Sequence, residues 1–182
     1  MKKQGFASAM VLFTAFAALI LAVNLKKTSA NEYGRVLSSY ATKIAGGDVN
    51  RLHNIKLAAK AMDGTILMPG EEFSFNERIG PTGKTRGFLL ARIFVKGQDK
   101  KGYGGGVCQV SSTLFNAAEM AGLEITERHP HSKKVKYVPE GRDAATSYGG
   151  IDLKFRNNFN FPVYIRSYTD RDSVVVSVFA VE

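Results

Sequence analysis

The sequence predicts an α+β domain, because helical patterns occupy its first part and strand patterns its last third. The chain has 182 residues, which is enough for one domain with its own hydrophobic core. Apolar residues make up 45% of the chain and charged residues 23%, as is typical of a folded protein. We therefore expect a single domain over residues 31–182, with a short helical lead-in over 31–64 and a core over 65–182.

The first 30 residues differ in composition from the rest. An uncharged apolar run from Phe6 to Val23 has two lysines on each side. Such a run is typical of a signal peptide or an N-terminal membrane anchor, since crossing the hydrocarbon takes roughly 20 apolar residues. Both interpretations of residues 1–30 remain open. Under either one, we expect residues 31–182 to work outside the cytoplasm, in the cell envelope.

The charge of the chain argues against nucleic acid and nucleotide partners. With 25 basic and 16 acidic residues the net charge is +9, and it falls to +5 without the four lysines beside the apolar run. The remaining surplus is spread out and forms no basic stripe with stacking aromatic residues. Gly83, Lys84 and Thr85 match the end of a phosphate-binding loop, but Arg78 stands where that loop needs its first glycine.

Two helices are predicted in the lead-in. Apolar residues recur every three or four positions over 33–44, which indicates a first helix ending at a pair of glycines. The segment 48–62 has the same spacing, with Asp48 as the predicted N-cap and Gly64 as the stop.

Strands are predicted for most of the core. Residues 65–75 alternate around a Pro-Gly pair, which suits a type II turn between two strands. Residues 88–97 suit a strand or a short helix, and the polar segment after them a mobile connection. The C-terminal third alternates apolar and polar residues in three segments, which predict an antiparallel β meander: 152–157, 162–169 and 173–181.

The single cysteine, Cys108, follows three glycines and begins a helical pattern that stops at Gly122. The first turn of a helix has unpaired N–H groups and the positive end of the helix dipole, which favour a thiolate. An exported chain with one cysteine cannot form an internal disulfide. We therefore predict a nucleophile at Cys108, with an inert buried cysteine as the alternative.

The glycines before the cysteine let backbone N–H groups approach a reacting carbonyl closely. The predicted oxyanion donors are accordingly the N–H groups of Gly106, Val107 and Cys108. Gln109 adds a side-chain donor next to them.

Candidate partners of the thiol lie downstream. His129 and His131 flank a proline that keeps them extended, and Asp143 follows. A cysteine, a histidine and an aspartate from separate segments can converge as nucleophile, base and orienter. A zinc site of Cys108, His129, His131 and Asp143 is an alternative, although it lacks a second cysteine or a helical histidine pair.

Four segments together resemble the VanW family of bacterial envelope proteins. They are PGEEFSFNERIGPT, GGGVCQVSSTLFNAAEMAGLEITERHPHS, YVPEGRDAATSYGGIDLKFRNN and FPVYIRSY, collinear from Met68 to Tyr168. Some family members are connected with L,D-transpeptidation, in which a cysteine forms 3-3 cross-links between peptidoglycan stem peptides.

The resemblance implies roles for individual residues. Cys108 falls on the family's cysteine, His131 on the histidine of its Arg-x-x-His-Ser pattern, and Asp143 on its Asp-Ala pair, which implies nucleophile, base and orienter. No metal or cofactor is implied. Further residues of the shared motifs are candidates for substrate contact: Arg128, Arg142, Ser111 and Tyr148.

The expected partner is therefore a peptidoglycan stem peptide, with the cytoplasmic membrane contacted through residues 6–23. Two other functions remain open at this point. One is a non-catalytic module that binds cell-wall peptide or glycopeptide, and the other is a peptidoglycan hydrolase that uses the same cysteine.

Overall fold

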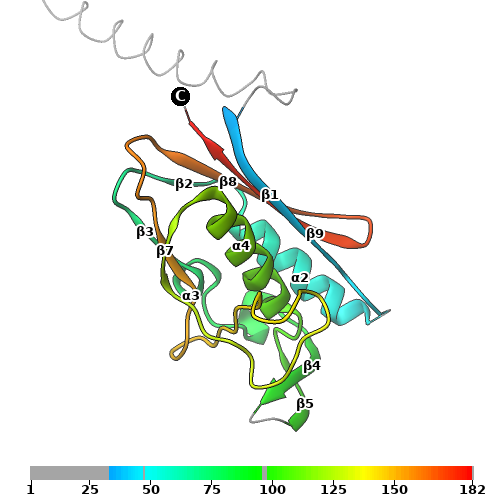
Figure 1. The fold of residues 1–182 in the computed structure, drawn as a ribbon. Coiled ribbons are helices and arrows are strands. Elements are labelled where there is room, and N and C mark those ends of the chain that lie inside the picture. The colour runs from blue at the N-terminus through cyan, green and yellow to red at the C-terminus, as the bar shows by residue number, and fades with distance from the viewer. Residues whose placement is uncertain (1–32, 47, 96–97, 182) are drawn as a thin grey trace, which may run out of the picture. The chain divides into compact units, whose positions relative to one another are not determined.

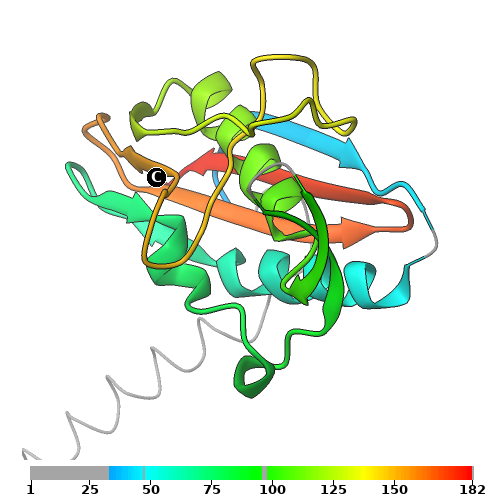
Figure 2. The same ribbon diagram turned by 90° about the horizontal axis from the view of Figure 1, so that it is seen from below.

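The main sheet of the domain carries two long helices on one face (Figures 1 and 2). The computed structural model describes residues 33–46, 48–95 and 98–181. All neighbours in the main sheet are antiparallel. Its strand order is β1 (Arg35–Lys43), β9 (Ser173–Ala180), β8 (Val163–Asp170) and β2 (Thr65–Leu67), and the helices are α2 (Val49–Met62) and α4 (Val107–Ala121).

Smaller elements complete the domain, and together they confirm the predicted α+β class. A second sheet has the order β3 (Glu72–Ser74), β7 (Lys154–Arg156) and β6 (Glu124–Glu127). A separate ribbon pairs β4 (Leu90–Val95) with β5 (Gln98–Tyr103). Two short helices lie between these strands in the chain: α3 (Phe75–Ile79) and η1 (Lys84–Arg86).

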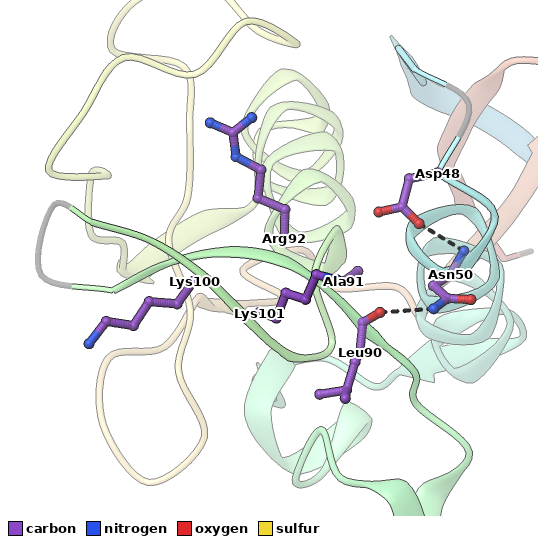
Figure 3. Close-up of a pocket in the computed structure, with 7 residues that line it drawn as sticks. All are labelled: Asp48, Asn50, Leu90, Ala91, Arg92, Lys100 and Lys101. Carbon is purple, nitrogen blue, oxygen red and sulfur yellow. Dashed lines mark hydrogen bonds between the residues drawn. The ribbon is translucent and has the colours of Figure 1, made fainter.

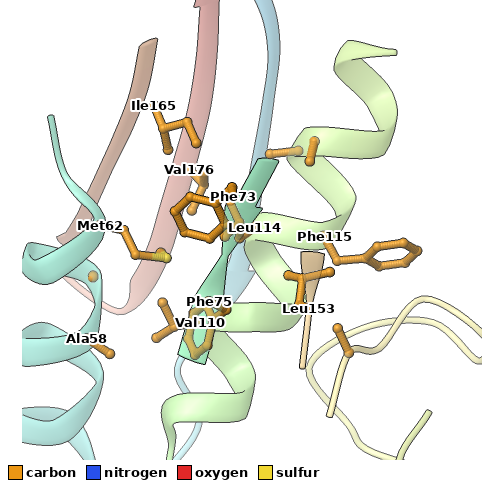
Figure 4. Packing of buried hydrophobic residues seen from close by; sticks show 14 of the residues in the cluster. Ala58, Met62, Phe73, Phe75, Val110, Leu114, Phe115, Leu153, Ile165 and Val176 are labelled. Carbon is orange, nitrogen blue, oxygen red and sulfur yellow. The ribbon is translucent and has the colours of Figure 1, made fainter. Parts of the chain in front are cut away.

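The hydrophobic core lies between the helices and the main sheet (Figure 4). Met62 of α2, Leu114 of α4 and Val176 of β9 meet there, and none of them is exposed to solvent. Full burial of an apolar side chain of this size contributes about 1.5–3 kcal/mol. This layer therefore holds α4, with Cys108 in its first turn, firmly against the sheet.

The helix predicted over residues 33–44 is wrong, since the chain forms strand β1 there, paired with β9. Two inward-facing side chains of β1 are polar and bind α4. Ser38 Oγ donates to the Ala117 carbonyl at 2.6 Å, and Thr42 Oγ1 lies 2.7 Å from Thr113 Oγ1. Because these buried positions are polar, the apolar alternation typical of a strand is hidden, and the remaining apolar residues fall at helical spacing.

The structure agrees better with the predictions for several other elements. Helix α2 begins as expected, because the Asp48 side chain accepts the N–H groups of Asn50 and Arg51. Strands β8 and β9 form the predicted antiparallel hairpin, whereas β7 lies in the second sheet. The polar segment predicted as a connection forms β5, because its backbone pairs with β4.

The predicted apolar segment, residues 6–23, lies outside the described residues. Within the described ranges, no helix combines the length and the hydrophobicity that are needed to span a bilayer.

A buried amide on α2 fixes the chain before Cys108. Asn54 is fully buried, and its Nδ2 donates to the carbonyls of Leu89 at 2.9 Å and Gly105 at 3.1 Å. Its Oδ1 accepts the Leu89 N–H at 2.8 Å. One side chain thus joins α2 to the start of the β4–β5 ribbon and to the glycine turn, residues 104–106, before α4.

Replacing Asn54 tests this role. Asn54→Ala removes the partner of one buried and two part-buried backbone groups. A buried group left without a partner costs about 1–3 kcal/mol, so we expect the free energy of unfolding to fall by about 3 kcal/mol. The matched control is Asn50→Ala, one turn earlier, which removes a single exposed bond to the Leu90 carbonyl and should cost about 1 kcal/mol or less. Urea unfolding of the full chain, followed by circular dichroism, measures both. Equal losses would contradict the assignment.

Candidate active site

Cys108 is the second residue of α4, and the glycine before that helix is required by its surroundings. Gly106 is the N-cap with φ of 106°, a left-handed conformation that glycine adopts without strain. A Cβ at this position would also meet Ile55 of α2 at 2.8 Å. The thiol is half-buried, with Sγ 3.6 Å from the Thr146 carbonyl oxygen and 4.0 Å from its hydroxyl.

His131 and Asp143 lie together beside the thiol. His131 Nδ1 is 2.6 Å from Asp143 Oδ2, and the same oxygen accepts the backbone N–H of His131 at 2.6 Å. The imidazole also lies close enough to the Cys108 sulfur for the two groups to shift each other's pKa. The structure therefore brings the three residues together from three separate segments, with His131 hydrogen-bonded to Asp143 and beside the thiol.

The pKa shifts of Cys108, His131 and Asp143 favour their ionised forms. Burial raises the pKa of the Cys108 thiol, but hydrogen bonds from His131 and Thr146 outweigh it and lower the pKa below the ordinary 9.0. Burial lowers the pKa of His131, yet its interactions with Cys108 and Asp143 raise it above the ordinary 6.5. The pKa of Asp143 is lowered, because the His131 hydrogen bonds outweigh burial. These shifts favour a thiolate and imidazolium pair beside an ionised carboxylate.

Two serines of α4 hold the Asp143 segment next to Cys108. Ser111 Oγ donates to the Ala144 carbonyl at 2.7 Å, and Ser112 Oγ accepts the Ala144 N–H at 2.9 Å. Both side chains are fully buried. Ser111 was predicted to contact substrate, but its burial and its bond to Ala144 give it a structural role instead.

The backbone donors predicted for an oxyanion hole divide into two groups. The predicted donor Val107 N–H is occupied, because it donates to the Gly104 carbonyl at 3.0 Å. The backbone N–H of Gln109 is occupied as well, since it donates to the Gly106 carbonyl at 3.0 Å. The N–H groups of Gly106 and Cys108 donate to no backbone carbonyl in the described part of the chain, so they remain candidates.

The side chain of Gln109 is not a donor at the site, which corrects the sequence prediction. It is 1% exposed and turned toward β1, where Nε2 donates to Thr42 Oγ1 and to the Lys43 carbonyl, both at 3.0 Å. Its Oε1 accepts a hydrogen bond from Arg51 of α2. Gln109 thus ties the first turn of α4 to β1 and α2.

The two arginines predicted to contact substrate are engaged within the protein. Arg128 donates through Nη2 to Asp143 Oδ1 at 2.9 Å and through Nε to the Asp143 carbonyl at 2.6 Å. Arg142 donates through Nε to Asn116 Oδ1 at 2.7 Å and pairs with Glu119. Arg128 therefore positions the carboxylate that orients His131, and Arg142 braces the middle of α4.

The remaining predicted residues lie apart from the thiol or face solvent. Tyr148 is 58% exposed, and its contact with substrate stays a prediction. His129 Nε2 lies 3.0 Å from Glu127 Oε1, so its ring is engaged away from His131. Over the described ranges, no group of three or more His, Cys, Asp and Glu side chains is arranged to hold a metal ion. The zinc alternative has no geometric support.

Tyr137 was not among the residues predicted for the site. Its ring lies edge-on to His131, with 6.4 Å between ring centroids. Burial, followed by the nearby Cys108, raises the pKa of Tyr137 far above its ordinary value, so the phenol stays protonated and can donate a hydrogen bond. Arg51 lies close to it, and burial lowers the pKa of this guanidinium. The only sequence signal for Tyr137 was its place in a motif of the resembled family.

A pocket of about 250 Å³ opens beside His131 and Asp143. Residues from the segment 128–141 supply the rest of its lining. The base and its orienter therefore border a space that solvent or a ligand can enter.

Comparison with known proteins gives consistent matches. A family profile described as "VanW like protein" matches residues 50–179. Uncharacterized protein YoaR of Bacillus subtilis is 44% identical over 144 residues, which cover 79% of this chain and 48% of the relative. Vancomycin B-type resistance protein VanW of Enterococcus faecalis is 35% identical over 138 residues, covering 72% and 50%. The chain spans about half the length of these relatives, and no solved structure matches it.

The lowered pKa of Cys108 can be measured directly, because the chain has one cysteine. Thiolate absorbance at 240 nm, corrected with Cys108→Ala, should titrate with a midpoint below 9.0. His131→Gln removes the cation and the hydrogen bond that lower this pKa, so the midpoint should move up. The matched control, His129→Gln, should leave it unchanged. A midpoint that does not respond to His131→Gln would show that the imidazole does not act on the thiol.

Proposed function

The chain belongs to the VanW family, and we propose that it is a cysteine-dependent acyl-transfer enzyme of the L,D-transpeptidase type. The observation that carries this proposal is the cluster of Cys108, His131 and Asp143 at the start of α4, in which His131 is hydrogen-bonded to Asp143 and lowers the pKa of the thiol. The proposed substrates are peptidoglycan stem peptides, reached outside the cytoplasm, with residues 6–23 as the export signal or anchor. The name of one relative, Vancomycin B-type resistance protein VanW, supports a role at the cell wall.

The first half-reaction breaks an amide bond of the donor peptide. The Cys108 thiolate attacks the carbonyl carbon that joins the third residue to the terminal D-alanine, and a pair of electrons moves to the carbonyl oxygen. The unoccupied N–H groups of Gly106 and Cys108 would stabilise this oxyanion. The His131 imidazolium then gives its proton to the departing amine. The C–N bond breaks, D-alanine leaves, and a thioester on Cys108 remains.

The second half-reaction forms a new amide bond. The amine of an acceptor stem attacks the thioester carbonyl, and the neutral His131 takes the proton from that amine. The C–S bond breaks and the thiolate returns. Because one amide is exchanged for another, the cycle needs no nucleotide and no oxidant, which suits a site outside the cytoplasm.

Asp143 acts through His131. Its carboxylate accepts from Nδ1 and from the backbone N–H of His131, which fixes the orientation of the ring beside Cys108. Arg128 holds the second carboxylate oxygen at 2.9 Å. Because Arg128 fixes Asp143 and Asp143 fixes His131, the imidazole ring needs little reorganisation during proton transfer.

Mass spectrometry of the full chain with disaccharide-tetrapeptide fragments tests the proposal. We expect loss of D-alanine, a covalent adduct on Cys108 and 3-3 linked dimers. Cys108→Ala should abolish all three. His131→Ala should slow adduct formation at least about 100-fold, the usual contribution of a general base, and the matched His129→Ala should leave the rate unchanged.

The other outcomes distinguish the remaining functions. Release of D-alanine without dimers would show that water resolves the thioester, as in a hydrolase. A folded chain that binds the fragments, yet forms neither adduct nor product, would be a binding module. Full activity in Cys108→Ala would overturn the assignment of the nucleophile.

A further inference from the structure

A pocket of about 420 Å³ lies between the start of α2 and the β4–β5 ribbon, where Asn50 donates to the Leu90 carbonyl at 2.9 Å (Figure 3). Cys108 does not line it, and the pocket of about 250 Å³ is lined by His131 and Asp143 but not by the cysteine. Neither pocket contains the sulfur. The groups nearest to an acyl donor at the thiol are therefore the direct neighbours of Sγ.

Thr146 is such a neighbour, and the chain on both sides of it is fixed. Its carbonyl oxygen lies 3.6 Å from Sγ of Cys108. Ala145 and Ser147 each donate their backbone N–H to the carbonyl of a residue outside this tripeptide, in both cases at 2.8 Å. The carbonyl oxygen of Thr146 therefore keeps its place beside the sulfur.

This carbonyl oxygen becomes available when the thiol ionises. In the described part of the chain it accepts a hydrogen bond only from the Cys108 thiol. Once His131 has taken the thiol proton, the sulfur has no hydrogen left to donate. The Thr146 oxygen then faces a negative sulfur without a donor, whereas backbone carbonyl groups shielded from water are nearly always paired. An N–H group of a bound substrate would supply the missing donor.

The distances suit the N–H of one particular substrate residue. An attacked carbonyl carbon lies about 3–3.5 Å from the nucleophile. The nitrogen of the same residue is about 2.5 Å from that carbon, because only Cα separates them. With the Thr146 oxygen 3.6 Å from Sγ, this nitrogen can reach the usual hydrogen-bond distance of about 2.9 Å. The scissile nitrogen is bonded to the same carbon, but it has to face His131, which protonates it.

From this geometry we propose that the Thr146 carbonyl oxygen accepts the backbone N–H of the residue whose acyl group is transferred to Cys108. The inference rests on the proposed function and names a substrate group that the same site recognises. Because this N–H and the attacked carbonyl belong to one residue, the hydrogen bond holds the carbonyl carbon against Sγ. A donor that lacks the N–H is therefore a poor substrate.

Two modified stem tetrapeptides test the inference on the full chain. In the first, an ester oxygen replaces the N–H that links the third residue to the second. In the matched control, the same replacement is made one residue earlier. Mass spectrometry follows the adduct on Cys108 with time. The first peptide should react about tenfold more slowly than the unmodified tetrapeptide, as the loss of one hydrogen bond allows, and the control peptide should react at the unmodified rate.

Thr146→Ala separates the carbonyl from the side chain. This variant loses the hydroxyl that lies 4.0 Å from Sγ and keeps the backbone carbonyl. The tenfold difference between the unmodified and the third-residue ester peptide should therefore persist, whatever the change in the absolute rates. A crystal structure of the full chain carrying Cys108→Ala, with the unmodified tetrapeptide bound, should place the third-residue nitrogen within about 3.2 Å of the Thr146 oxygen.

Loss of the difference in Thr146→Ala would assign the recognition to the hydroxyl and overturn the inference. An equal loss of rate with the control ester would overturn it as well. The two proposals fail separately. A tetrapeptide bound at the Thr146 oxygen in the crystal, without an adduct on Cys108 in the unsubstituted chain, would remove the enzyme and keep the contact. An adduct formed equally fast from the unmodified and the third-residue ester peptide would keep the enzyme and remove the contact.

Discussion

The buried polar face of α4 is the constraint on which the candidate site depends. Each of its side chains finds a partner in another element, since a buried group left without one costs about 1–3 kcal/mol. Gln109 binds β1 and α2, whereas the two serines bind Ala144, next to Asp143. These bonds fix both the rotation of α4 and the position of the 142–144 segment. The face consists of Gln109, Ser111, Ser112, Thr113 and Asn116.

This polar face also explains how far the sequence could predict the structure. Helix α2 and the β8–β9 hairpin were predictable, because a cap and regular apolar alternation mark them locally. Strand β1 was not, since Ser38 and Thr42 are buried only because α4 offers them partners. The convergence of Cys108, His131 and Asp143 was predicted from residue types and a family resemblance. The roles of Gln109, Ser111 and Arg128 depend on contacts between distant segments, which no local pattern records.

Glycine is needed at the positions before Cys108 for a different reason from the one that the sequence suggested. They were expected to open the backbone to a reacting carbonyl. In the structure Gly105 lies against Ala91 and Arg92, and Gly106 against Ile55 in a left-handed conformation. A side chain at either position would push the start of α4 away from α2 or from the ribbon. Close packing alone therefore accounts for these two glycines, and the free N–H of Gly106 is a consequence of its place at the N-cap.

The same packing bears on the ionisation of the thiol. Interactions with His131 and Thr146 lower the pKa of Cys108 against the effect of burial, and both depend on where the first turn of α4 lies. The backbone of Gly105 leads into that turn, and Asn54 holds it by binding Gly105 and Leu89. The buried amide of α2 thus supports the ionisation of the cysteine through the position of the helix that carries it.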